Sequence, residues 1–347
     1  MGAFRAFAVV TSALLVQDAA LVRHFDYDAK AALDVKEVGV AHRSSADVHD
    51  ITYASPKGGH VPAYLVVPKR PRPERGAGGK PGEAGPPSES ERGWGPASIG
   101  RSSFAAVIWG HWYWANSPQR NRTEFLDEAV ALAQAGVVSL LTDGPIARPG
   151  HVEDKDPLSE RQAADLQQQV IDVRRGVDVL LARRDVDRNR LAFVGHSYNA
   201  AVGATLSGVD RRFKAFVLMA GTMSDELDVK TPEYQEYRRK MGPEKFDAFM
   251  AKYSWLDQGK YVSHAAPAVV FLQYGTQEKF LTPERARQYE KIVSEPKKFQ
   301  LYDAPHALNA EARRDRMAFL TKQLELKPLP PNVIAAIPDL VQPPEPK

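Results

Sequence analysis

The sequence predicts an α/β fold in which helices cover both faces of a mostly parallel sheet. Short runs of strand length recur along the middle of the chain, they are continuously apolar, and helical patterns lie between most of them. Continuous apolar strands are typical of a sheet buried on both faces, and strand–helix alternation is typical of parallel connections. With 347 residues, 43% of them hydrophobic, the chain can form one large domain of this kind.

The parallel part of the predicted sheet begins with the apolar run 104–109. A helix over residues 123–134 follows, because Leu126, Ala129 and Val130 share one helix face with Ala133. The later elements are the strand 137–141, the helix 159–182, the strand 191–194, a helix from Tyr198, the strands 215–219 and 268–273, the helix 283–293, the strand 298–302 and the helix 310–324.

Two further segments complete the predicted fold. The runs 49–54 and 61–67 have no helix between them and predict an antiparallel hairpin before the parallel strands. Residues 222–263 are rich in helix formers and include Tyr234, Tyr237, Phe246, Phe249 and Tyr253, which predicts a small helical cover over the sheet. Simple packing of this segment on the surface is the alternative interpretation.

The predicted domain covers residues 48–326 and contains an insertion at 70–102. Residues 71–101 include eight glycines and six prolines and few aliphatic side chains, so this segment cannot bury enough apolar area to offset its ordering entropy. We therefore expect a disordered insertion between two strands. The proline-rich residues 327–347 predict an extended tail.

The N-terminus predicts a signal peptide at residues 1–17. Arg5 precedes eleven mostly apolar residues, 6–16, which is the length of a signal-peptide core and too short to span a bilayer. We therefore expect an exported protein, periplasmic or secreted, with no membrane span. The alternative is a first helix that packs on the domain of a cytoplasmic protein.

Composition excludes several classes of function. The absence of cysteine excludes disulfides, thiolate metal sites and a cysteine nucleophile. The net charge of +3 is carried entirely by residues 69–101, so the predicted domain has no basic excess with which to bind nucleic acid. No His-rich metal motif and no glycine-rich phosphate loop is present, so we expect neither a metal nor a cofactor.

Ser197 is the predicted nucleophile. It lies in the sequence Gly195-His196-Ser197-Tyr198-Asn199, directly between a strand and a helix of small residues. A serine at such a sharp turn presents its hydroxyl above the sheet edge, and small residues two positions away relieve the crowding of the turn. Asn199 departs from this pattern, because a smaller residue is usual there. A plain helix N-cap is the alternative role for Ser197.

Glu278 and His306 are the predicted partners of Ser197. Glu278 follows the strand 268–273 on a short turn, and His306 lies in the loop between the last strand and the last helix. In a parallel sheet both loops lie at the carboxyl edge, where ligands bind. Three other carboxylates compete for the role of the acid: Asp225, Glu226 and Asp303.

The loop after residues 104–109 is the predicted oxyanion side of the site. We expect the backbone N–H groups of Trp112 and Tyr198 to stabilise a developing oxyanion, the latter from the start of a helix. The side chains of Trp112, Tyr113, Trp114 and Tyr198 are expected to line a substrate pocket, although packing on the core is an alternative role. His111 is expected to be structural.

These motifs resemble the α/β-hydrolase fold and, within it, the dienelactone hydrolase and acetyl xylan esterase group, over residues 48–324. The resemblance implies a cofactor-free serine hydrolase that cleaves carboxylic esters through an acyl-enzyme, with Ser197, His306 and Glu278 as the triad. Its substrate would be a small-molecule or carbohydrate-linked ester. A peptidase of the prolyl oligopeptidase type and a catalytically silent binding protein are the alternatives, and the oligomeric state is left open.

Overall fold

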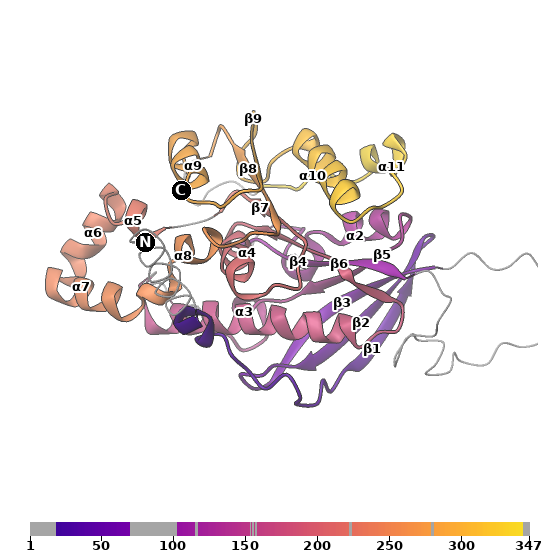
Figure 1. Ribbon diagram of the computed structural model, residues 1–347, viewed down its shortest axis with the longest axis horizontal. Helices are drawn as coiled ribbons and strands as arrows, with labels where there is room; N and C mark the ends of the chain where they lie inside the picture. Colours follow the sequence, from indigo (N-terminus) through magenta and orange to yellow (C-terminus); the bar gives the residue numbers. More distant parts are fainter. Residues whose placement is uncertain are drawn as a thin grey trace, which may run out of the picture.

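The computed structural model describes residues 19–69, 103–114, 117–152, 154, 156, 158–221, 224–278 and 281–342. Nine strands in this part of the chain form a single sheet (Figure 1). The strands are β1 (Lys36–His42), β2 (Ala46–Ala54), β3 (His60–Pro68), β4 (Phe104–Gly110), β5 (Val137–Thr142), β6 (Val186–His196), β7 (Ala215–Met219), β8 (Val269–Gly275) and β9 (Lys297–Tyr302).

The sheet has the order β1-β2-β3-β5-β4-β6-β7-β8-β9. Strands β1 to β3 form an antiparallel meander, and β3 pairs antiparallel with β5. All pairs from β5 to β9 are parallel. The mostly parallel sheet and the antiparallel hairpin before it are therefore confirmed.

Strand β1 lies outside the predicted domain, so the sheet begins before residue 48. All seven of its residues are exposed, and β1 pairs only with β2 at the edge of the sheet. An exposed edge strand buries no apolar face, so its sequence carries no hydrophobic pattern from which it could be predicted.

Helices cover both faces of the sheet, as predicted. They are η1 (Asn121–Thr123), α2 (Leu126–Ala133), η2 (Pro145–Ala147), α3 (Glu160–Leu181), α4 (Tyr198–Val209), α5 (Asp225–Asp228), α6 (Pro232–Met241), α7 (Pro243–Lys252), η3 (Ser254–Leu256), α8 (Gly259–Val262), α9 (Pro283–Glu290), α10 (Ala310–Gln323) and α11 (Pro331–Ala335). Side chains of α3, α4, α8 and α9 belong to one hydrophobic core, and side chains of α2 and α10 belong to the other.

Alternation along β4 shows how the two cores are separated. Ala106 and Ile108 pack into the core beneath α3 and α4, whereas Ala105, Val107 and Trp109 pack into the core beneath α2 and α10. Successive side chains of a strand point to opposite faces, so a strand between two cores must be apolar throughout. This accounts for the continuous apolar run that predicts the strand.

The segment between β7 and β8 forms the small helical cover. It contains the helices from α5 to α8, and α8 makes its closest packing with α4. Figure 1 shows α6 and α7 at one end of the molecule, beyond α5 and α8. Most of their side chains are exposed, and only Phe246 is buried on α7.

The residues after Leu326 are more ordered than an extended tail. They include the short helix α11, and Leu329 and Ile337 are buried in the core beneath α10. The predicted signal peptide at residues 1–17, the insertion 70–102 and residues 343–347 lie outside the described residues. Among the described helices, none has the length and apolar composition needed to cross a bilayer.

Candidate active site

Ser197 lies at a sharp turn between β6 and α4, at the carboxyl edge of the sheet. Its backbone angles are φ 55° and ψ −115°. This conformation is strained for a residue with a side chain, and such strain persists only where the surrounding structure enforces it. The Ser197 hydroxyl makes no capping hydrogen bond to α4, so a plain N-cap does not account for the serine.

Close backbone contacts enforce this turn. A Cβ atom at Gly195 would collide with the backbone carbonyl of Asn199, and one at Gly221 would collide with the backbone of Ser197. Glycine is therefore required at both positions, because the start of α4 lies directly against β6 and against the end of β7.

Glu278 and His306 form a short hydrogen bond at the same edge. The distance from Glu278 Oε2 to His306 Nδ1 is 2.5 Å, and both residues are buried, with 6% and 8% of their surface exposed. Glu278 follows the end of β8, and His306 follows the end of β9. The glutamate thus fixes the orientation of the His306 ring through Nδ1.

The three competing carboxylates have other partners or surroundings. The Asp303 carboxylate accepts a hydrogen bond of 2.9 Å from Gln277 Nε2, so it supports the Glu278 loop. Asp225 and Glu226 lie on α5, where burial and the neighbouring Asp257 raise the pKa of Asp225 to about 7.

Aromatic rings surround His306. The ring of Trp112 lies parallel to it at 6.3 Å between centroids, and that of Trp114 lies at 5.8 Å. His196 also stacks on it, at 5.1 Å. Because His196 directly precedes Ser197, this contact brings the loop of His306 to the turn that carries the serine.

The other two predicted pocket side chains have different surroundings. Tyr113 is 42% exposed. Tyr198 packs against the core beneath α3 and α4, and its hydroxyl is buried with no hydrogen-bond partner. Burial also raises the pKa of this hydroxyl. Of the four predicted pocket residues, Trp112 and Trp114 are the two with a ring contact to His306.

The predicted oxyanion role of the Trp112 N–H needs correction. In the structure this N–H donates to Glu124 Oε2 at 2.5 Å, so it is directed to a buried carboxyl group. Tyr198, by contrast, is the first residue of α4, and the first N–H groups of a helix have no partner within the helix. The Tyr198 N–H therefore remains the candidate donor.

Glu124 and His196 form a buried pair that the sequence analysis missed. Glu124 Oε1 lies 2.6 Å from His196 Nδ1, and His196 Nε2 lies 2.9 Å from the backbone carbonyl oxygen of His306. Neither side chain of the pair is exposed. A histidine at the end of an apolar strand, directly before the nucleophile, was the one signal available in the sequence.

Hydrogen-bond partners and burial together favour one protonation state of this pair. His196 Nε2 faces a carbonyl oxygen and must carry a hydrogen, so a neutral ring has a bare Nδ1 that accepts from Glu124. Burial raises the pKa of Glu124 to about 8 and lowers the pKa of His196 to about 4. Both shifts favour a protonated glutamic acid beside a neutral histidine at neutral pH.

His111 is structural, as expected. Its Nδ1 donates to the carbonyl oxygen of Trp112 at 2.6 Å, and its Nε2 accepts from the N–H of Gly144 at 3.0 Å. With both ring nitrogens used, His111 joins the loop after β4 to the turn after β5.

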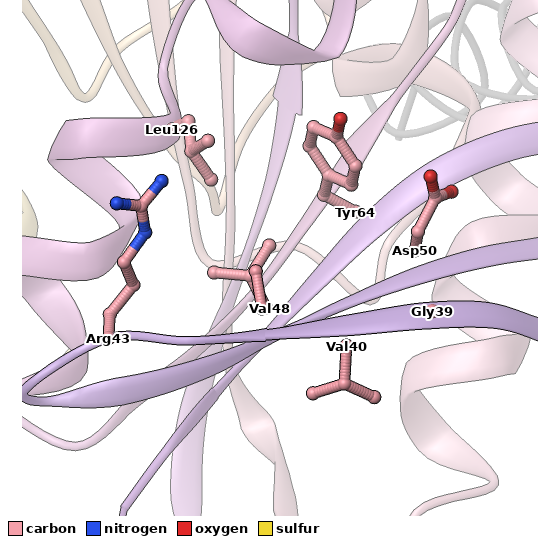
Figure 2. A pocket seen from close by; sticks show the side chains of 8 residues that line it. Gly39, Val40, Arg43, Val48, Asp50, Tyr64 and Leu126 are labelled. Carbon is pink, nitrogen blue, oxygen red and sulfur yellow. The ribbon is translucent and has the colours of Figure 1, made fainter.

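A separate groove of about 320 Å³ lies on the antiparallel side of the sheet, where β1 to β3 meet the start of α2. Figure 2 shows Arg43, Val48, Asp50, Tyr64 and Leu126 around it. None of the predicted site residues lines this groove.

Comparisons with solved structures identify the fold. An acetyl xylan esterase from Paenibacillus sp. R4 is 18% identical, with a TM-score of 0.62 over 89% of this chain and 92% of its own. Acetyl xylan esterase 1 from Thermoanaerobacterium sp. JW/SL YS485 is 16% identical, with a TM-score of 0.64 over 88% and 93%. A glucuronoyl esterase from Solibacter usitatus is 11% identical, with a TM-score of 0.54 over 88% and 91%.

No family model and no curated protein matches the sequence. The architecture nevertheless defines a class, since the sheet order, the turn at Ser197 and these neighbours together describe the α/β-hydrolase fold. The chain has that fold, and acetyl xylan esterases are among the solved structures that share it.

Proposed function

We propose that this protein is a serine hydrolase that cleaves carboxylic esters through an acyl-enzyme intermediate. The observation that carries the proposal is the 2.5 Å hydrogen bond between Glu278 and His306, at the sheet edge where Ser197 is held in its strained turn. A nucleophile, a base and an orienting acid on three neighbouring loops are the components of acyl transfer.

Acylation begins with attack of Ser197 Oγ on the ester carbonyl carbon. His306 Nε2 accepts the hydroxyl proton, and Glu278 stabilises the resulting imidazolium through Nδ1. The tetrahedral intermediate then collapses: the bond to the alcohol oxygen breaks, and His306 returns the proton to that oxygen. The products are a free alcohol and an acyl group bound to Ser197.

Deacylation repeats these steps with water as the nucleophile. His306 takes a proton from the water, the new oxygen–carbon bond forms, and the proton passes to Ser197 as the acyl bond breaks. The N–H of Tyr198, at the positive end of the α4 dipole, stabilises the oxyanion in both halves of the reaction.

The substrate class is a small-molecule or carbohydrate-linked ester. The solved structures with the same architecture are named as an acetyl xylan esterase and a glucuronoyl esterase, which supports a carbohydrate ester. Aromatic side chains are suited to stack on the apolar face of such a ligand, and Trp112 and Trp114 lie beside His306.

Labelling and turnover of the purified protein test the proposal. A fluorophosphonate probe should label the wild-type chain once, and p-nitrophenyl acetate should be hydrolysed. Ser197→Ala should abolish both without loss of folding, whereas Ser294→Ala, at a distant turn beside α8, should leave both unchanged. Retained labelling of the Ser197→Ala variant would disprove the nucleophile assignment.

The same preparation separates the alternative functions. Faster turnover of an aminoacyl-prolyl anilide than of simple esters would indicate a peptidase of the prolyl oligopeptidase type. Neither labelling nor turnover would indicate a silent binding protein. Esters of increasing acyl length, and acetylated xylan fragments, would then define the substrate within the ester class.

We also propose that the chain is exported, on the basis of the apolar residues 6–16. Expression of the full chain in a bacterium, followed by fractionation and mass determination, tests this. A chain shortened by about 17 residues in the periplasm or medium is the expected product. A full-length chain in the cytoplasm would contradict export.

A further inference from the structure

Two loops of the candidate site are joined by one side chain outside the triad. Glu124 lies between η1 and α2, 12 positions after Trp112 and far in sequence from His306. Glu124 Oε2 accepts a hydrogen bond from the Trp112 N–H, and Glu124 Oε1 contacts His196 Nδ1. His196 Nε2 in turn donates to the backbone carbonyl of His306. The chain of contacts runs without a break from the loop after β4 to the loop after β9.

We propose that Glu124 is a positioning residue: a neutral carboxylic acid that clamps the Trp112 loop to the backbone of His306 through His196. This inference rests on the proposed function, because it concerns the geometry of the same histidine. Glu124 itself touches neither Ser197 nor the predicted path of the proton, so its effect is exerted through the two loops.

The clamp completes the positioning of His306. Glu278 fixes the ring at Nδ1, and the His196 hydrogen bond fixes the backbone carbonyl of the same residue. Stacking of the His306 ring on His196 and Trp112 limits its rotation. A general base must lie within hydrogen-bond reach of its proton, and a displacement of about 1 Å costs on the order of 100-fold in rate.

The neutral form of the clamp follows from its hydrogen bonds. Glu124 Oε2 accepts from the Trp112 N–H, and Oε1 donates to the bare Nδ1 of His196, so each oxygen of a protonated carboxyl has one suitable partner. An ionised Glu124 would have no hydrogen to give to a neutral His196. Charging both residues would bury an ion pair with no exposed atom.

Charged groups on the neighbouring elements do not reverse this preference. The His111 ring of the β4 loop brings no charge, because its Nε2 accepts from the Gly144 N–H. Glu128 of α2 opposes ionisation of Glu124, whereas Arg316 of α10 favours it. Arg316 donates from Nε to Glu128 at 2.8 Å, so the positive charge of Arg316 is largely compensated by the Glu128 carboxylate. Glu278 and Glu128 favour protonation of His196, whereas Arg316 and burial oppose it.

Substitution by glutamine tests the neutral clamp directly. An amide reproduces a protonated carboxyl: its NH2 can donate to His196 Nδ1, and its oxygen can accept from the Trp112 N–H. We expect Glu124→Gln to keep kcat within about threefold of wild type. Glu124→Met has a similar length and no polar atom for either contact, and we expect it to lower kcat at least about tenfold with little change in KM.

Glu128 supplies the matched control, one helical turn away. Its carboxylate accepts two hydrogen bonds from the Arg316 guanidinium, which an amide cannot reproduce. Glu128→Gln should therefore lower the midpoint of thermal unfolding, whereas Glu124→Gln should not. The same chemical change thus has opposite effects at two neighbouring buried positions.

The pH dependence of unfolding gives a readout that does not depend on catalysis. Because folding raises the pKa of Glu124 from 4.5 to about 8, its contribution to stability is complete below pH 4.5 and is lost as pH rises through about 8. Glutamine does not titrate. The unfolding midpoint of Glu124→Gln should therefore rise relative to that of wild type as the pH is raised from about 5 to about 8, and the difference should level off above that.

Several outcomes would overturn the proposal. They are a kcat of Glu124→Gln as low as that of Glu124→Met, a kcat of Glu124→Met equal to wild type, and identical pH profiles of unfolding for wild type and Glu124→Gln. A Glu124→Gln variant that does not fold would also overturn it. If Glu124→Met does not fold, His196→Phe replaces it, since phenylalanine keeps the stacking and removes both hydrogen bonds.

Failure of the proposed function would be recognised separately. Fluorophosphonate labelling that persists in the Ser197→Ala variant would disprove the assignment of Ser197 as the nucleophile. The contrast between Glu124→Gln and Glu124→Met in unfolding, and in whatever ester turnover the wild type shows, would still decide whether the clamp exists.

Discussion

The side chain of Asn199 occupies the space that a side chain at Gly110 would need. A Cβ atom at Gly110 would lie 2.5 Å from Asn199 Cβ. The bulk of Asn199, where the turn usually has a smaller residue, is thus accommodated by a glycine at the end of β4. The amide of Asn199 then donates to the carbonyl of His111 at 2.7 Å and accepts from Gln169 at 3.0 Å, which joins α4 to the β4 loop and to α3.

We predict that Gly110→Ala destabilises the protein and lowers activity. The added methyl group meets backbone-proximal atoms of Asn199, which cannot move without shifting the start of α4 and therefore Ser197. Overpacking of this kind costs about 1–3 kcal/mol of the free energy of unfolding. Chemical denaturation and ester turnover measure the two effects.

Gly39→Ala is the matched control, because nothing lies within 4 Å of a Cβ at Gly39 and its φ is not positive. It should change stability by less than about 0.5 kcal/mol. If the clash is the cause, combining Gly110→Ala with Asn199→Gly, which removes the Cβ atom that the new methyl group would meet, should cost less than the sum of the two single changes. Strict additivity would contradict this explanation.

Glu278→Gln should lower kcat by on the order of 10²–10⁴. A glutamine NH2 directed at His306 Nδ1 would favour the tautomer with its hydrogen on Nε2, which cannot accept a proton there. A glutamine oxygen at Nδ1 would keep the tautomer but carry no charge to stabilise the imidazolium. Steady-state kinetics with a p-nitrophenyl ester measure the change. Because the effect falls on the transition state, KM should change little.

The competing carboxylates serve as controls for that change. Asp303→Asn, Asp225→Asn and Glu226→Gln should each cost less than about tenfold in kcat, since Glu278 is the carboxylate that is hydrogen-bonded to His306. A large loss of kcat in Asp225→Asn or Glu226→Gln, with Glu278→Gln still active, would contradict our assignment. The acid of the triad would then be a residue that follows β7.

The sequence predicts the elements whose signal is local. Buried strands such as β4 and β6 are continuously apolar because side chains on both faces enter a core, and this pattern is visible without knowledge of the fold. Strand β1 and helix α11 have no such signal. They form because β2 and α10 offer partners, and a partner distant in sequence leaves no local periodicity.

The candidate site divides in the same way. Ser197 and His306 follow strands directly, so their place at the carboxyl edge follows from the fold class. The Glu124–His196 pair joins residues 72 positions apart through buried hydrogen bonds. The orientation of the Trp112 N–H depends on that pair, and for this reason the sequence could not predict its partner.

Deletion of residues 71–101 should leave activity and stability almost unchanged. The flanking residues belong to the end of β3 and the start of β4, and β4 runs parallel to β6, so they lie at the edge of the sheet opposite Ser197. Loop-closure entropy changes by only about 0.6 kcal/mol for each doubling of loop length. Ester turnover and thermal unfolding of a variant with a short glycine linker measure both effects. Loss of most activity would show that the insertion reaches the site.

The C-terminal segment spans the two loops that frame His306. Val341 N–H donates to Gln119 Oε1 at 3.1 Å, and its carbonyl accepts from the Ser117 hydroxyl at 3.1 Å. Gln342 Oε1 accepts from the N–H of Ala307 at 3.2 Å. Residues 117–119 and 307 belong to the Trp112 loop and the His306 loop, so the end of the chain connects both loops from outside.

We therefore predict that deletion of residues 341–347 lowers kcat/KM by about three- to tenfold, whereas deletion of residues 343–347 does not. The longer deletion removes three hydrogen bonds, each with a net contribution of about 0.5–1.5 kcal/mol, while the shorter one keeps them. Because α11 and the buried Ile337 remain in both variants, the midpoint of thermal unfolding should fall only slightly. Turnover of a p-nitrophenyl ester by the two truncated proteins, measured beside the full chain, checks the prediction. Equal activity of the two truncated proteins would mean that the loops hold His306 in place without the C-terminal segment.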